Sequence, residues 1–107
     1  MANTFKRAVL PNIGTALGTV YTVPAVTTTV VIGLTLSNIS GGSITATVQL
    51  VTAGGTSHIA KDIPIPGGSS IELMAGNKYV MEATDAIKVS GSVVGAIDAT
   101  MSLMEIN

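Results

Sequence analysis

The sequence predicts an all-β domain, and three observations lead to this fold class. The chain of 107 residues contains 14 Thr, 12 Val and 11 Ile, so 37 residues are β-branched. Such side chains lose rotamer freedom in helices and pack well on a pleated surface. No window longer than about two turns keeps an apolar stripe at helical spacing. Glycine pairs begin at Gly41, Gly54 and Gly67, a spacing typical of one strand plus one turn.

The first two extended segments are short. Residues 4–10 are expected to form an extended arm or a short strand that ends at Pro11. Residues 17–23, LGTVYTV, alternate between polar and apolar side chains and stop at the next proline. We therefore divide the chain into an N-terminal arm, 1–14, and a single β-domain, 15–107.

Two longer strands are expected over 27–38 and 44–50. In ITATVQL (44–50) the apolar side chains alternate with Thr45 and Thr47, which is the pattern of a half-buried strand with threonines on its outer face. In 27–38 the alternate side chains expected on one face are Val30, Ile32, Leu34 and Leu36.

The second half of the chain contains further short segments with strand character. They cover residues 57–65, 69–73, 77–82, 85–90 and 96–106. In the last segment Ile97, Ala99, Met101 and Leu103 share one face. A change of parity near Met104 is expected to bring Ile106 inward, as a β-bulge or a sheet edge would do.

Eight or nine strands at this spacing indicate a β-sandwich or barrel rather than βαβ units. Paired glycines supply the positive φ values of tight connections. Pro64 and Pro66 fit an edge strand at the point where the chain passes between sheets. We predict a single-domain antiparallel β-sandwich that is jelly-roll-like, with an immunoglobulin-like sandwich as the alternative. Its expected core contains Ile32, Leu34, Val48, Leu50, Ile71, Leu73, Ile87 and Met101.

The composition argues against several classes of protein. A net charge of −1 with 10% charged residues lacks the basic face of a nucleic-acid binder. Phe5, Tyr21 and Tyr79 are the three aromatic residues, too few for a base- or sugar-stacking platform. The absence of cysteine excludes a disulfide framework. The N-terminal apolar run is too short for a signal peptide, and no stretch of 18 apolar residues predicts a membrane span.

The residues that could carry chemistry are few and scattered. His58 is the single histidine, and Asp62 on the same expected strand face lies roughly 13 Å away. Glu82 and Asp85 are close only in the turn EATD, where we expect Asp85 to make local backbone hydrogen bonds. Asn38 begins an Asn-Ile-Ser glycosylation pattern that we interpret as a chance match. We expect no catalytic, cofactor or metal site, and hence no enzyme.

One half of the chain is almost free of charge. From Ala8 to Ala60 there is no Asp, Glu, Lys or Arg, whereas nine of the eleven charged residues lie in 61–107. Soluble proteins normally protect exposed strand edges with charge, especially with lysine. Two interpretations follow: either a partner covers this half, or threonine hydroxyls such as those of Thr35 and Thr45 keep an exposed sheet solvated.

With the strands placed, four stretches resemble a known class of proteins. They are VYTVPAVTTTVVIGLTLSN, KDIPIPGGSSIEL, GNKYVMEATDAIKVSG and the terminal MSLMEIN. Together they are similar to small β-sandwich structural proteins of tailed bacteriophage virions, those of marine and cyanobacterial phages in particular. The similarity covers most of residues 18–107. The chain departs from the commonest pattern at Val26 and Thr84, where glycine would be expected.

The resemblance implies a non-enzymatic virion protein, most simply a capsid decoration (cement) protein on the outside of the shell. A neck, tail or fibre-base component is the alternative, and a carbohydrate-binding module is a weaker one. The implied partners are the major capsid protein or other virion subunits, with a homo-oligomer, a trimer for preference, assembled in the host cytoplasm. We expect no nucleic-acid or membrane partner. The expected interface residues are Phe5, Lys6, Arg7 and Leu10 of the arm, together with Thr35 and Thr45.

Overall fold

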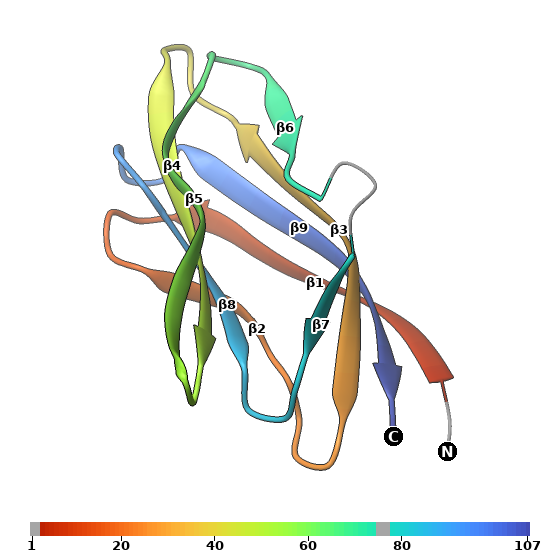
Figure 1. The fold of residues 1–107 in the computed structure, drawn as a ribbon. Helices are drawn as coiled ribbons and strands as arrows, with labels where there is room; N and C mark the ends of the chain where they lie inside the picture. The colour runs from red at the N-terminus through yellow and green to blue at the C-terminus, as the bar shows by residue number, and fades with distance from the viewer. Residues whose placement is uncertain (1–2, 75–77) are drawn as a thin grey trace.

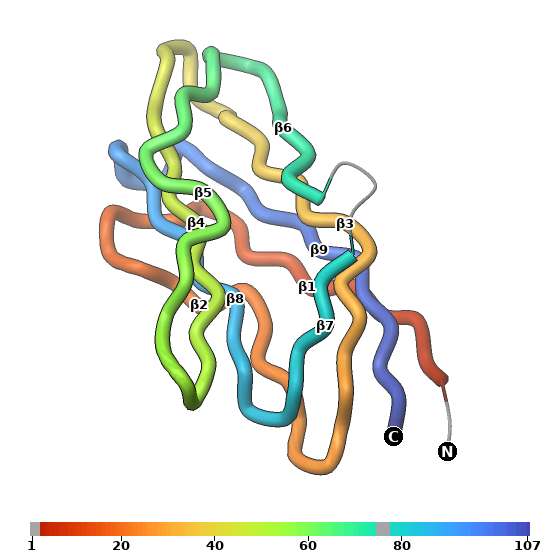
Figure 2. The backbone as a smooth tube through the Cα atoms, viewed as in Figure 1, coloured from red at the N-terminus to blue at the C-terminus, as the bar shows by residue number. Residues whose placement is uncertain are grey.

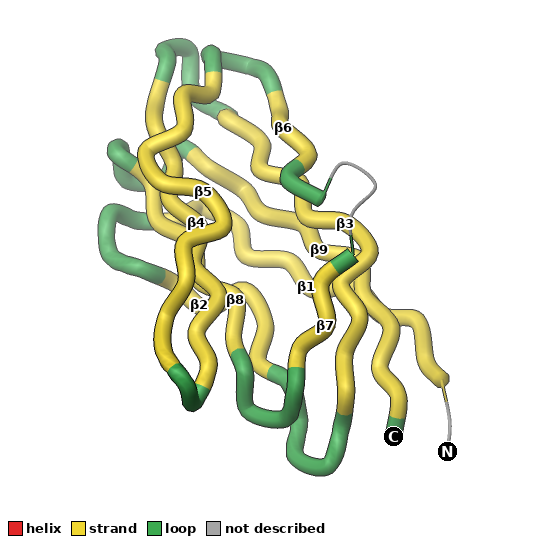
Figure 3. The backbone as a smooth tube through the Cα atoms, in the orientation of Figure 1, coloured by secondary structure: helices red, strands yellow, loops and turns green. Residues whose placement is uncertain are grey.

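The computed structural model describes residues 3–74 and 78–107, and within these residues all regular structure is β-strand. Turns and short loops connect the strands (Figure 3). The strands are β1 (Asn3–Ile13), β2 (Gly18–Thr22), β3 (Thr28–Asn38), β4 (Ile44–Thr52), β5 (Gly55–Ile65), β6 (Ser70–Glu72), β7 (Tyr79–Met81), β8 (Ala86–Gly91) and β9 (Ile97–Ile106).

The strands form two antiparallel sheets that face each other (Figure 1). Sheet A has the order β1-β9-β3-β6, and β7 pairs with β3 beyond the end of β6. Sheet B has the order β2-β8-β4-β5. The predicted antiparallel β-sandwich is therefore confirmed.

The strand order is that of a jelly roll, which is a long hairpin folded up into a sandwich. The first half of the chain runs through β1 to β4 and turns back at Ala53 and Gly54. The second half then retraces it, so that β5 pairs with β4, β6 and β7 with β3, β8 with β2, and β9 with β1. Figure 2 shows this path, in which the late blue segments lie beside the early red and orange ones. The immunoglobulin-like alternative has a different strand order and is not the fold.

The core lies between the sheets and is built from the alternate inward side chains of both. Four of the eight residues expected there, Leu34, Val48, Ile87 and Met101, are fully buried. Leu50, Ile71 and Leu73 are partly buried and pack against the core from its margin. The expected position of Ile32 is wrong, because its side chain is 39% exposed.

A β-bulge in β3 explains the error at Ile32. The register between β3 and β9 shifts between Val31 and Gly33, so one residue of β3 has no partner there. Val31 precedes the shift and Leu34 follows it, and both are fully buried, whereas strict alternation cannot bury both. Val30 therefore also lies on the outer face, contrary to the prediction.

The parity change expected near Met104 does not occur. β9 alternates without interruption from Ile97 to Ile106, and Glu105 is the inward residue at its end, 4% exposed. Hydropathy favours Ile106 over Glu105 as the inward residue at this end of the strand, but the structure buries Glu105. The buried carboxylate is stabilised by polar partners instead, which are described below.

The turn PGGS closes one end of the sandwich, as predicted. β5 belongs to sheet B and β6 to sheet A, so Pro66 lies where the chain passes between the sheets. A Cβ on Gly67 would lie 2.7 Å from the backbone C and O atoms of Gly41. The two glycine-rich turns therefore pack against each other, and this close approach, rather than a positive φ, requires glycine at position 67. Gly68 does have a positive φ, of 72°.

Two long strands of the uncharged half lie in the interior of their sheets. β3 and β4, both from the uncharged half of the chain, are interior strands with neighbours on both sides. Lys6 and Arg7 lie on the edge strand β1, and Lys61 and Asp62 lie on the edge strand β5. Interior strands have no free edge to protect, so the lack of charge on β3 and β4 does not require a partner to cover them.

Candidate interaction surface

A row of apolar side chains crosses the outer face of sheet A. In the strand register Phe5 of β1 pairs with Met104 of β9, Met104 with Val30 of β3, and Val30 with Val80 of β7. Directly paired residues point to the same side of a sheet, so these four side chains lie in line across four strands. We call them the apolar row.

The apolar row faces solvent. Phe5 is 75% exposed and Val80 is 65% exposed, while Met104 and Val30 between them are half-buried. Ile32, raised to the outer face by the bulge, and Ile106 are further apolar side chains of the same sheet that are incompletely buried. Contiguous exposed apolar surface of this kind is a mark of interaction sites in soluble proteins.

A polar cluster lies on the inner side of sheet A behind the row. Glu105 accepts a hydrogen bond of 2.6 Å from the hydroxyl of Tyr21 and forms an ion pair of 2.9 Å with the Lys6 ammonium. The Tyr21 hydroxyl is also 2.8 Å from the hydroxyl of Thr29. Because Tyr21 belongs to β2 and the others to β1, β3 and β9, the cluster joins the two sheets.

The cluster shifts the pKa values of its members in opposite directions. The hydrogen bond from Tyr21 and the bond and charge of Lys6 stabilise the carboxylate, so the pKa of Glu105 lies below its usual value despite burial. Partial burial and the hydrogen bond to Glu105 raise the pKa of Tyr21 to about 12. At neutral pH Tyr21 is therefore a neutral donor and Glu105 a charged acceptor.

A second carboxylate, that of Glu72, fills a gap at the β6 and β7 edge of sheet A. It accepts hydrogen bonds of 2.9 Å from the backbone N–H groups of Leu34 and Met74 and from the hydroxyl of Thr35. Partial burial pushes the pKa of Glu72 upward, but these three donors outweigh that effect and leave it lowered. Glu72 thus caps the stretch of β3 between its pairings with β7 and β6.

The expected interface residues do not all share one surface. Phe5 and Arg7 lie on the outer face of sheet A, as does Thr35. Thr45 lies on the outer face of sheet B, on the opposite side of the sandwich. Lys6 is directed to the inner side and pairs with Glu105.

The N-terminal arm is an integral strand of the fold. β1 pairs with β9 from Asn3 to Ile13, and Leu10 and Ala8 pack against the core. Of the two expectations for this segment, the separate arm is therefore corrected, and the strand is longer than expected because it continues past Pro11 to Ile13. No local pattern indicates this pairing, because the two partner strands lie about ninety residues apart in the chain.

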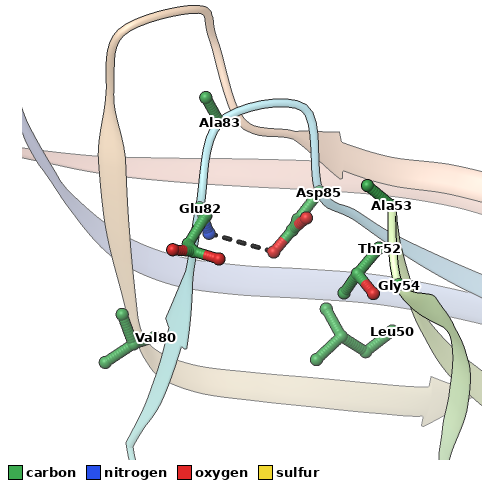
Figure 4. Close-up of a pocket in the computed structure, with 8 residues that line it drawn as sticks. All are labelled: Leu50, Thr52, Ala53, Gly54, Val80, Glu82, Ala83 and Asp85. Carbon is green, nitrogen blue, oxygen red and sulfur yellow. Dashed lines mark hydrogen bonds between the residues drawn. The ribbon is translucent and has the colours of Figure 1, made fainter.

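A shallow hollow of about 490 Å³ lies between the β4–β5 hairpin and the β7–β8 turn (Figure 4). Its lining includes Leu50, Thr52, Glu82 and Asp85. Figure 4 shows Asp85 turned toward the backbone nitrogen of Glu82, from which it accepts a bond of 2.9 Å. The predicted local bonding of Asp85 is confirmed. Thr52 likewise donates to the backbone oxygen of Gly55, so both groups stabilise turns.

The remaining candidates have structural partners. His58 is exposed on β5, and its Nε2 lies 3.1 Å from the side-chain nitrogen of Gln49 on the paired strand. Asn38 is 2% exposed, and its amide nitrogen donates to the backbone oxygens of Gly42 and Ile65. An amide held in this way inside the fold is not available for glycosylation.

Two kinds of feature are absent from the described residues. No group of three or more His, Cys, Asp or Glu side chains there is arranged to hold a metal ion. Within residues 3–74 and 78–107, there is no helix long and apolar enough to cross a membrane.

Comparison with known proteins supports the fold. No protein-family model and no curated protein matches the sequence. Among solved structures the chain is similar to one from Bacillus endospore appendages, described as a novel family of disulfide-linked pili. The TM-score is 0.55 at 12% sequence identity, over 96% of this chain and 85% of that one. At this identity the likeness shows a common β-sandwich architecture.

Proposed function

We propose that this chain is a non-enzymatic structural subunit that decorates the shell of a tailed-bacteriophage particle and binds its neighbours through the outer face of sheet A. The observation that carries the proposal is the apolar row, which crosses four strands and is open to solvent. Complete burial of a Val, Met or Phe side chain gains about 1.5–3 kcal/mol relative to exposure. A partner that covers the row therefore has a substantial driving force for binding.

Two further considerations support this proposal. The jelly roll is a common architecture of viral capsid domains, and the sequence resembles small phage virion proteins. The similar solved structure forms disulfide-linked pili, but this chain has no cysteine. These 107 residues cannot make a disulfide of that kind, so we propose that the contacts with neighbours are non-covalent.

The proposal is tested on particles. Virions of the phage that encodes the chain are purified, and the ratio of the chain to the major shell protein is measured by quantitative mass spectrometry. We expect a fixed ratio that survives repeated gradient purification. A chain that is absent from purified particles, or present only in traces, contradicts the proposal.

Two lysine variants locate the binding face. Val30→Lys puts a charge into the apolar row, whereas Thr45→Lys puts the same charge on the outer face of sheet B. Particles lacking the chain are incubated with each purified variant. We expect Val30→Lys to lose binding and Thr45→Lys to bind normally, because an unpaired charge is costly to bury. The reverse result would place the interface on sheet B.

A further inference from the structure

The four sheet edges of this sandwich differ in how well they are protected. Natural proteins guard a free edge with short strands, bulges, proline or charge, because its unpaired N–H and C=O groups can bind another strand. In sheet A, β6 and β7 are three residues each. In sheet B, β2 is five residues long and its register shifts between Thr19 and Tyr21. These edges offer little regular strand.

The long edge strand β5 carries several protective features. Its register with β4 shifts twice, between Ala46 and Val48 and between Val48 and Gln49. Asp62 has a positive φ of 50°, and Pro64 has no N–H to donate. Regular pairing is therefore limited to the four residues 55–58, which pair with β4 without a shift, and a second strand could not continue it along the rest of this edge.

β1 is the exception. It pairs with β9 without a register shift from Asn3 to Leu10, so its outer edge is also regular over this stretch. Residues 3–7 are all exposed, whereas the Leu10 side chain packs inward, where a Cβ built on Gly18 of β2 would lie 3.0 Å from it. The lysine that would usually guard such an edge, Lys6, is bonded to Glu105. The free and regular edge is thus 3–7.

We propose that residues 3–7 pair with the same residues of a second copy of the chain, antiparallel and with Phe5 opposite Phe5 of that copy. The pairing joins two copies of sheet A into one continuous sheet across a two-fold axis. A strand that pairs with itself in this way forms an isologous interface, the commonest kind in homo-oligomers.

Charge disfavours two of the neighbouring registers. With Phe5 on the axis, Arg7 lies opposite Asn3 and Lys6 opposite Thr4 of the other copy. A shift that centres the axis on Lys6 or Arg7 puts like charges directly opposite each other, which is destabilising. A shift further along the strand brings Pro11 into the ladder, where it cannot donate a hydrogen bond.

The same register continues the apolar row. Phe5 is the end of the row at the β1 edge, so Phe5 opposite Phe5 joins the two rows into one that crosses both copies. The outer faces stay on the same side because the axis is perpendicular to the sheet. This inference deepens the proposed function. The idea that the two joined apolar rows bind a particle rests on that function. The pairing itself is a property of the chain alone.

The absence of cysteine from the chain allows a direct test on the purified protein. Directly opposed residues in an antiparallel ladder have Cα atoms about 4.5–5.5 Å apart, within the range of a disulfide. Under mild oxidation Phe5→Cys should therefore form a covalent dimer. Val9→Cys, on the same face of the same strand, is the matched control. In the proposed register its two copies are about 27 Å apart, and it should stay monomeric on a denaturing gel.

Sedimentation equilibrium completes the test without a cross-link. The unmodified chain should show a concentration-dependent dimer, and Phe5→Lys should be monomeric with an unchanged melting temperature, because Phe5 is exposed in the single copy. A monomeric unmodified chain, a trimer, or faster cross-linking at Val9 than at Phe5 would overturn the pairing. None of these results bears on whether the chain is found in purified virions, so failure of the pairing and failure of the proposed function are separate outcomes.

Discussion

Glu105 at the end of sheet A and Tyr21 of sheet B share a hydrogen bond of 2.6 Å, which ties the two layers together behind the apolar row. Glu105 is 4% exposed and has Lys6 as its counter-ion. A buried carboxylate is tolerated in this position because one of its oxygens accepts the Tyr21 hydrogen bond and the other pairs with the Lys6 ammonium. The bond makes the stability of the sandwich depend on pH at both ends of the scale.

Glu105→Gln should lower the free energy of unfolding by about 1–3 kcal/mol at pH 7, since it weakens the bonds to Tyr21 and Lys6. The folded-state pKa of Glu105 is below the usual value of 4.5, so its contribution is present above that value and is lost as the pH falls through the folded-state pKa. Urea unfolding of both proteins from pH 7 to pH 3 should show the difference shrinking. A difference that stays constant over this range would contradict the assignment.

Tyr21→Phe tests how the stability of the fold depends on pH in the alkaline range. The pKa of Tyr21 is raised from 10.0 to about 12, so the folded protein holds the phenolic proton more tightly than the unfolded chain. Stability should therefore fall as the pH rises from about 10 to 12. Thermal melts across this range should show a weaker decline for Tyr21→Phe than for the unmodified protein. Tyr79→Phe, which changes the other tyrosine, serves as the control.

Val26 and Thr84 have positive φ values of 55° and 74°. These are the two positions at which the phage-protein pattern favours glycine. A β-branched residue in this conformation costs of order 1–3 kcal/mol, whereas the extra chain entropy of glycine costs roughly 0.5–1 kcal/mol. Val26→Gly and Thr84→Gly should each raise the melting temperature by a few degrees.

The neighbouring Ala25→Gly is the control for these variants. Ala25 is exposed and has no positive φ, so glycine there should leave the melting temperature unchanged or lower it. If Val26→Gly and Thr84→Gly lower the melting temperature as much as Ala25→Gly does, the two turns are not strained.

Gly67→Ala should be clearly destabilising, by about 1–3 kcal/mol, because its methyl group would meet the backbone of Gly41 at 2.7 Å. Gly41→Ala is the matched control from the other side of the same contact, since a Cβ there meets nothing within 4 Å. Chemical denaturation of the two variants should separate them. Equal stability would show that the two turns can move apart.

Leu34→Ala and Leu50→Ala compare the centre and margin of the core. Leu34 is fully buried, so its truncation should cost about 2–5 kcal/mol. Leu50 lies beside the hollow at the sandwich margin and is partly exposed, so its truncation should cost less. If Leu50→Ala is as destabilising as Leu34→Ala, the hollow is closed in solution.

Much of the fold could be predicted because a regular strand has a recognisable local sequence pattern. The alternation in ITATVQL places Ile44, Ala46 and Val48 in the core, as the structure confirms. The passage between sheets at IPIPGGSS was likewise predicted, since proline and glycine restrict the backbone at their own positions. Prediction failed in β3, where a bulge near Ile32 reversed the parity of half the strand. A bulge depends on the partner strand and leaves no local pattern.

The candidate surface was predicted only in part. Phe5 is among the expected interface residues, but Val30, Val80 and Met104 of the same row are not. Met104 and Val80 could have been found by following the outward parity of their strands. Nothing in the sequence, however, indicated that they would lie in one row with Phe5.

The sequence by itself determined the β-rich composition, the positions of the turns and the inward or outward parity of the regular strands, because backbone propensity and the two-residue period of a strand are local properties. The tertiary structure alone decided which strands meet. It placed β1 beside β9, brought Glu105 against Tyr21 and aligned the apolar row from four separate strands. The physical reason is that register is fixed by packing between residues distant in the chain, and one bulge is enough to change which side chains a strand presents.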